Sequence, residues 1–138
     1  MGLVEKIQII DRRIIADSRG YFLKVLTGKE EGLPAHTGEI YVTSAKPGEA
    51  KGGHYHPKAN EWFTLLQGEC KLNLIDISTG ERLLILLNCT EPKTVFVPSG
   101  VAHLFYNSSN SNDFLLLAYS DELFVPENTI AFTGFDKN

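Results

Sequence analysis

Short runs of strand-forming residues, separated by turn-forming residues at fairly even intervals, are the feature that most limits how this chain can fold. Gly, Pro, Asp, Asn and Ser gather in turns at residues 17–20, 46–48, 78–80, 98–100 and 107–113. The runs between the turns are rich in β-branched, aromatic or leucine residues: 40–44, 62–66, 70–75, 83–87, 94–97 and 114–119. This repetition is typical of a sandwich or barrel, so we predict an all-β fold.

Helix signals are weak. Residues 26–32 contain helix-forming side chains, but Gly28, Gly32 and Pro34 interrupt them, so we expect at most a turn or two of helix there. A chain of 138 residues is long enough to bury a core, and no linker or repeat divides it, so a single domain over residues 1–138 is expected.

The composition restricts the compartment and the partners. Cys70 and Cys89 form neither a CxxC pair nor a dense framework, and no signal peptide precedes the fold, which indicates a cytoplasmic protein with free thiols. No apolar run is long enough to span a membrane. The formal net charge is -4 and the basic residues are scattered, so a nucleic acid polymer is not an expected partner and a small molecule is.

Three histidines and one glutamate form the candidate site. His54 and His56 are two residues apart, and on a strand this spacing places both imidazoles on one face. Glu61 shares the inward face with Phe63 and Leu65 at a period of two. His103 follows a second tight turn, and an all-β fold can bring it close to the other three. The four side chains together suit zinc, iron, nickel or manganese, without choosing among them.

These residues carry a resemblance to the cupin superfamily. The first cupin pattern, Gly-x5-His-x-His-x4-Glu-x6-Gly, runs from Gly48 to Gly68, and the second, Pro-x-Gly-x2-His-x3-Asn, runs from Pro98 to Asn107. Both patterns match in full. The resemblance implies a jelly-roll barrel in which His54, His56, Glu61 and His103 are the metal-binding positions.

A narrower resemblance covers most of the chain. Residues 17–22 resemble the Asp-x-Arg-Gly-x-Phe signature of dTDP-4-dehydrorhamnose 3,5-epimerases and related sugar-nucleotide ketoisomerases. Residues 38–68 and 120–127 are similar to the cupin domain of capsular-polysaccharide enzymes that epimerise a UDP-linked sugar. The resemblance implies an epimerase or 3,4-ketoisomerase acting on a nucleotide-linked 4-keto hexose for surface polysaccharide, active as a homodimer and without an organic cofactor.

The same resemblance suggests roles for individual residues. A neutral imidazole beside a ketone can remove the acidified neighbouring proton as a general base, and His54 and His56 are expected nearest to this chemistry. For the acid, Tyr41 resembles a tyrosine of ketoisomerases. Tyr119 is close to the epimerase position but displaced by about one residue, which reverses the face on which it lies.

Substrate contacts are expected from three further residues. Arg19 resembles an arginine that contacts the diphosphate, and an arginine fork matches phosphate geometry. Lys51 stands where an arginine is common and supplies charge without a bidentate contact. Asn107 closes the second cupin pattern and is expected to contact substrate.

Two other classes of function use the same residues. A metal-dependent cupin enzyme, such as a dioxygenase or a phosphosugar isomerase, would use all four metal-binding positions and an open coordination position. A sugar-binding cupin without catalytic activity would need only the cavity. One barrel hosts many chemistries, so the fold does not choose among the three classes.

Overall fold

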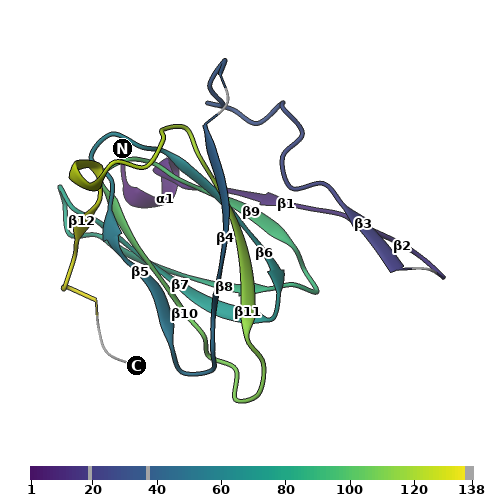
Figure 1. Cartoon of the computed structure of the whole chain (residues 1–138). Coiled ribbons are helices and arrows are strands. Elements are labelled where there is room, and N and C mark those ends of the chain that lie inside the picture. Colours follow the sequence, from purple (N-terminus) through teal and green to yellow (C-terminus); the bar gives the residue numbers. More distant parts are fainter. Residues whose placement is uncertain (19, 37, 136–138) are drawn as a thin grey trace.

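A computed structural model describes residues 1–18, 20–36 and 38–135 of the chain. Two five-stranded antiparallel sheets pack around one core, in the orders β1-β9-β6-β11-β4 and β12-β5-β10-β7-β8, and β2 and β3 form a separate hairpin (Figure 1). The elements are α1 (Leu3–Lys6), β1 (Gln8–Asp11), β2 (Ile14–Asp17), β3 (Gly20–Leu23), β4 (Glu39–Ala45), β5 (Ala50–Tyr55), β6 (Glu61–Gln67), β7 (Glu69–Asp76), β8 (Arg82–Asn88), β9 (Lys93–Val97), β10 (Val101–Tyr106), β11 (Phe114–Ser120), the 3-10 helix η1 (Pro126–Asn128) and β12 (Ile130–Ala131).

The all-β prediction is confirmed. All six predicted runs lie largely within strands, because alternate apolar side chains point into the space between the two sheets. The core draws on both sheets, with Phe63 and Leu116 from one facing Leu72, Leu74 and Phe105 from the other.

The weak helix signal near residues 26–32 gives no helix, which agrees with the expected limit of a turn or two. Residues 26–32 contain bends and turns without a helix, because Gly28 and Gly32 have left-handed φ values of 87° and 86°, which a right-handed helix does not contain. The helical segments that the described residues do form are α1 and η1. None of the helices in the described ranges is long and apolar enough to cross a membrane.

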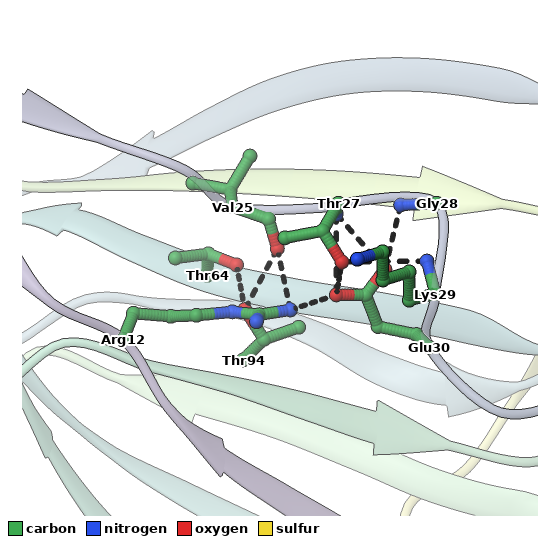
Figure 2. Close-up of polar contacts among 8 residues, drawn as sticks. All are labelled: Arg12, Val25, Thr27, Gly28, Lys29, Glu30, Thr64 and Thr94. Carbon is green, nitrogen blue, oxygen red and sulfur yellow. Dashed lines mark hydrogen bonds and ion pairs between the residues drawn. The ribbon is translucent and has the colours of Figure 1, made fainter.

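A buried ion pair fastens the connection between β3 and β4 onto the outer face of the first sheet (Figure 2). Arg12 donates to Glu30 at 2.5 Å, to the carbonyl oxygen of Val25 at 3.0 Å and to the Thr94 hydroxyl at 2.9 Å. The Thr94 hydroxyl in turn donates to Val25 at 3.0 Å and accepts from the Thr64 hydroxyl at 2.9 Å. Arg12 is therefore committed to the fold and is not a free cation for an anionic ligand.

The hairpin of β2 and β3 pairs with neither sheet and extends away from both in Figure 1. On β2, Ile14 and Ile15 are exposed. The edge strand β4 likewise exposes Ile40 and Val42. The hairpin of β2 and β3 and the edge strand β4 therefore carry several of the exposed large apolar side chains.

Candidate functional site

Two neighbouring strands of the second sheet bring the three histidines together. His54 on β5 pairs with His103 on β10, and His56 follows β5 directly. The ring centroid of His54 lies 4.9 Å from that of His56 and 4.8 Å from that of His103. One ring nitrogen of each histidine lies within 4.8 Å of those of the other two.

A glycine bulge sets the direction of His54. The register between β5 and β10 shifts beside His103. His103 pairs with His54, but the next residue, Leu104, pairs with Gly52. Gly53 is therefore the extra residue of a bulge on β5. Both glycines have left-handed backbone angles, with φ of 94° and 79°. A Cβ atom on Gly52 would lie 2.7 Å from the carbonyl oxygen of His103, so only glycine allows the two strands to approach this closely.

Glu61, at the start of β6, brings a carboxylate from the opposite sheet. Its side chain is buried, and its Oε1 lies 2.9 Å from Nε2 of His56 and 3.5 Å from Nε2 of His103. Its Oε2 accepts a hydrogen bond of 2.8 Å from the Tyr41 hydroxyl on β4. The carboxylate therefore joins both sheets at the floor of the site.

Backbone carbonyls determine which nitrogen of His56 and His103 carries hydrogen. Nδ1 of His56 lies 2.9 Å from the carbonyl oxygen of Asn128, and Nδ1 of His103 lies 3.4 Å from that of Val101. A carbonyl only accepts, so an Nδ1 that is hydrogen-bonded to it carries the hydrogen, and the neutral ring in that form has its lone pair on Nε2, which faces the Glu61 carboxylate. Nε2 of His56 and Oε1 of Glu61 are buried, close together and without a hydrogen-bond partner. Two facing acceptors require a cation between them, either a proton or a metal ion.

The electrostatics separate the histidines. Burial lowers the pKa of His54, and the neighbouring His56 lowers it further. Burial also lowers the pKa of His103, to about 4. For His56 burial opposes the charge, but the Glu61 carboxylate outweighs it and raises the pKa. Burial likewise works against ionised Glu61, yet His56, His103 and Tyr41 lower its pKa. At neutral pH His54 and His103 are therefore neutral bases beside an ionised carboxylate.

A cavity of about 460 Å³ opens above these side chains. Its floor contains His54, His56, Glu61 and Tyr41, and its apolar wall is the run Leu123, Phe124 and Val125. Glu39 and Glu122 also line it, and no lysine or arginine does so within the described part of the chain. A smaller cavity of about 180 Å³ shares Tyr41 and His54 and includes Lys51. The site thus offers bases, an acid and an apolar wall to one bound molecule.

The residues predicted from sequence fall into four groups. His54, His56, Glu61 and Tyr41 line the larger cavity, and His103 lies beside Glu61 and His54 and lines the smaller one. Lys51 lines only the smaller of the two cavities described above. Arg19 lies outside the described residues.

Tyr119 and Asn107 are not brought to the cluster. Tyr119 points to the outer face of β11, where its hydroxyl accepts from Gly38 and donates to the carbonyl oxygen of His36. This is the reversed facing that its one-residue displacement predicts. Asn107 is fully buried, and its side chain binds the backbone of Ala45, Ser109 and Asn112, so it holds the loop after β10.

Sequence reasoning missed the residues that hold His56 from behind. The carbonyl oxygen of Asn128 and the hydroxyl of Thr129 lie 2.9 Å and 3.3 Å from its Nδ1. A backbone acceptor leaves no mark on residue identity, and these residues are far from His56 along the chain. No sequence pattern pointed to them.

Comparison with known proteins places this geometry in a family context. The family model described as "Polysaccharide biosynthesis C-terminal domain" matches residues 15–132. The UDP-2-acetamido-2,6-beta-L-arabino-hexul-4-ose reductase of Pseudomonas aeruginosa is 28% identical over 113 residues, which are 82% of this chain and 28% of that protein. The spore coat polysaccharide biosynthesis protein SpsL of Bacillus subtilis is 29% identical over 93 residues, which are 64% of this chain and 61% of that protein. This chain thus spans less than two thirds of either relative.

Among solved structures, dTDP-6-deoxy-D-glucose-3,5-epimerase RmlC from Legionella pneumophila, in complex with dTDP-4-keto-L-rhamnose, has the same fold. The TM-score is 0.84 at 20% sequence identity, covering 98% of this chain and 77% of that chain. The similarity confirms the predicted cupin-type jelly roll.

Proposed function

Because this chain belongs to the polysaccharide biosynthesis C-terminal domain family, we propose that it is an isomerase of nucleotide-linked 4-keto hexoses used for surface polysaccharide. The single observation that carries the proposal is a neutral imidazole, His54, at the floor of a cavity large enough for a ligand of this class. The ligand in the RmlC structure, dTDP-4-keto-L-rhamnose, and the sugar in the name of the reductase relative are both nucleotide-linked 4-keto sugars.

The proposed reaction begins with proton removal from the carbon next to the ketone. The lone pair of His54 takes the proton, and the electron pair of the broken C–H bond moves toward the carbonyl oxygen to give an enolate. Return of a proton to the opposite face of that carbon gives the epimer, and rearrangement through the enediol moves the ketone by one carbon. No electron leaves or enters the sugar, so the step requires no redox cofactor.

Tyr41 is the proposed acid. Its hydroxyl lines the same cavity, and its pKa is raised by burial and by the Glu61 carboxylate, so it stays protonated. The observed position of Tyr119, on the outer face of β11, argues against the same role for that residue. His56 is proposed to assist from beside His54.

The diphosphate is proposed to lie toward the smaller cavity. Lys51 is a cation that lines it, whereas carboxylates line the larger cavity. A lysine attracts phosphate as a point charge. Arg19 is proposed to contact the same diphosphate. We further propose that the protein acts in the cytoplasm as a homodimer. Sedimentation analysis tests the dimer.

A metal-dependent enzyme is the second candidate. The observation that favours it is the buried pair of acceptors, Nε2 of His56 and Oε1 of Glu61, without a hydrogen-bond partner. His54, His56, Glu61 and His103 would hold the ion, and a divalent transition metal supplies a Lewis acid that polarises a carbonyl oxygen. Zinc, iron, nickel and manganese all suit these donors. In this case a nitrogen of His54 is occupied and His54 does not act as the base.

Proton exchange with solvent tests the proposal. In deuterated water, dTDP- and UDP-linked 4-keto-6-deoxyhexoses should gain deuterium beside the ketone, which NMR detects, and His54→Ala should abolish the exchange. His36→Ala is the matched control, because His36 is exposed and its side chain lines neither cavity. Exchange that persists in His54→Ala contradicts the assigned base. Exchange lost after chelation and restored by a metal favours the second candidate, and saturable sugar binding without exchange favours a binding protein.

A further inference from the structure

The last described segment of the chain is fastened along the strand that carries the histidines. Ile130 and Ala131 of β12 pair with Tyr55 and His54 of β5 (Figure 1). The backbone N–H of Phe132 donates to the carbonyl oxygen of Gly53 at 2.8 Å. This segment therefore backs the site directly.

Asn128, at the end of η1, uses both its side chain and its backbone in this contact. Its Oδ1 accepts a hydrogen bond of 2.9 Å from the backbone N–H of Lys58, two residues after His56. Its own N–H donates to Val125 at 3.0 Å, which closes the turn of η1. With residue 128 held in this way, its carbonyl oxygen points at Nδ1 of His56, 2.9 Å away.

We propose that Asn128 is a positioning residue that fixes His56 as the Nδ1–H tautomer and so keeps the Nε2 lone pair directed into the site. Thr129 supports it as a second acceptor, with Oγ1 3.3 Å from the same nitrogen. The role follows from the acceptor-only chemistry of the Asn128 carbonyl at Nδ1 and from the direction of Nε2, which faces the Glu61 carboxylate in the site at 2.9 Å. The inference deepens the proposed function, since it names what prepares one base of that site, but its test requires neither substrate nor metal.

Long-range ¹H–¹⁵N spectra of the whole chain, labelled in its four histidines, read the tautomer directly. They are recorded in chelator at alkaline pH, where imidazoles are neutral. The wild type should show Nδ1–H at His56. Asn128→Ala removes the acceptor for Lys58, frees the turn, and should introduce the Nε2–H form that an unconstrained imidazole favours.

Two further variants separate positioning from general damage. Asn128→Asp keeps an acceptor oxygen for the Lys58 N–H and should retain the wild-type tautomer. Asn88→Ala removes a similar local cap, since Oδ1 of Asn88 accepts from the N–H and hydroxyl of Thr90, away from the cavity. It should leave the His56 signals unchanged.

Zinc alone provides a second readout. Loss of a group that orients a metal-binding histidine lowers affinity about 10- to 100-fold, so competition with a chromophoric chelator should show this loss in Asn128→Ala but not in Asn128→Asp. Nε2–H at His56 in the wild type overturns the inference, even if Asn128→Ala does not fold. An unchanged tautomer in folded Asn128→Ala also overturns it. Either result leaves the isomerase assay unaffected, so the two proposals fail independently.

Discussion

Replacing Glu30 with glutamine should remove one defined part of the acid sensitivity of the fold. The Glu30 side chain is 3% exposed and faces Arg12 across the connection between β3 and β4. Burial raises its pKa, but the hydrogen bonds from Arg12 and Thr27 outweigh burial and lower the pKa from 4.5 to about 2. The ionised carboxylate is therefore more stable in the folded chain than in the unfolded one.

The size of the effect follows from this shift. At about 1.4 kcal/mol per pKa unit, the ionised carboxylate contributes about 3 kcal/mol at pH 7. Because the folded pKa is depressed, this stability is fully present above pH 4.5 and is lost as the pH falls toward 2. At pH 3 the same relation leaves about 1.4 kcal/mol. The difference in unfolding free energy between wild type and Glu30→Gln should thus shrink by about 2 kcal/mol from pH 7 to pH 3.

Urea unfolding followed by circular dichroism at both pH values measures this difference. Asp11→Asn is the matched control, because Asp11 pairs with Lys93 on the surface with its side chain 84% exposed, where ion pairs contribute little. A wild-type to Glu30→Gln difference that stays constant between pH 7 and pH 3 would refute the electrostatic account of this contact.

Three further experiments test other parts of the fold. Gly52→Ala should destabilise the chain more than Gly48→Ala, because both residues have left-handed φ values but only a Cβ at Gly52 would meet backbone atoms. The left-handed angle alone costs about 1–2 kcal/mol in each variant. Equal losses of stability in thermal unfolding would contradict the close approach of β5 and β10 at Gly52. Tyr41→Phe leaves Oε2 of buried Glu61 without its hydrogen-bond donor and should lower the unfolding free energy in urea at pH 7 by about 1–3 kcal/mol. An unchanged unfolding free energy would show that this hydrogen bond does not stabilise the fold. Burial raises the pKa of Cys70 to about 12, so iodoacetamide should label the partly exposed Cys89 first. Peptide mapping measures the order of labelling, and early labelling of Cys70 would contradict its burial.

Much of the barrel and the site could be predicted because the information is local. Alternation at a period of two indicated strands, and it correctly placed Glu61, Phe63 and Leu65 on one face. The His-x-His spacing brought two imidazoles to the site, and turn residues marked the hairpins. These signals survive in one sequence because each depends on neighbouring residues.

The parts that could not be predicted depend on distant partners. Trp62 alternates away from the barrel interior yet is 1% exposed, with its ring packed against Phe96 and Tyr119. Asn107 belongs to the second cupin pattern, yet the structure uses it to hold a loop. The contact of His56 with Asn128 is made by a backbone oxygen, which every residue has, so a sequence pattern does not reveal the contact. Such contacts are specified by the tertiary arrangement and not by residue type.

The long separation along the chain between His56 and Asn128 affects when the site is completed as the protein is translated and folds. The three histidines and Glu61 have been translated by residue 103, but the oxygen that orients His56 arrives only with residue 128. A nascent chain that ends between β11 and η1 therefore has the cluster, but the ring of His56 is not yet fixed. Folds dominated by such non-local pairing form in milliseconds to seconds, so completion of the site should coincide with docking of β12 rather than with closure of the sheets.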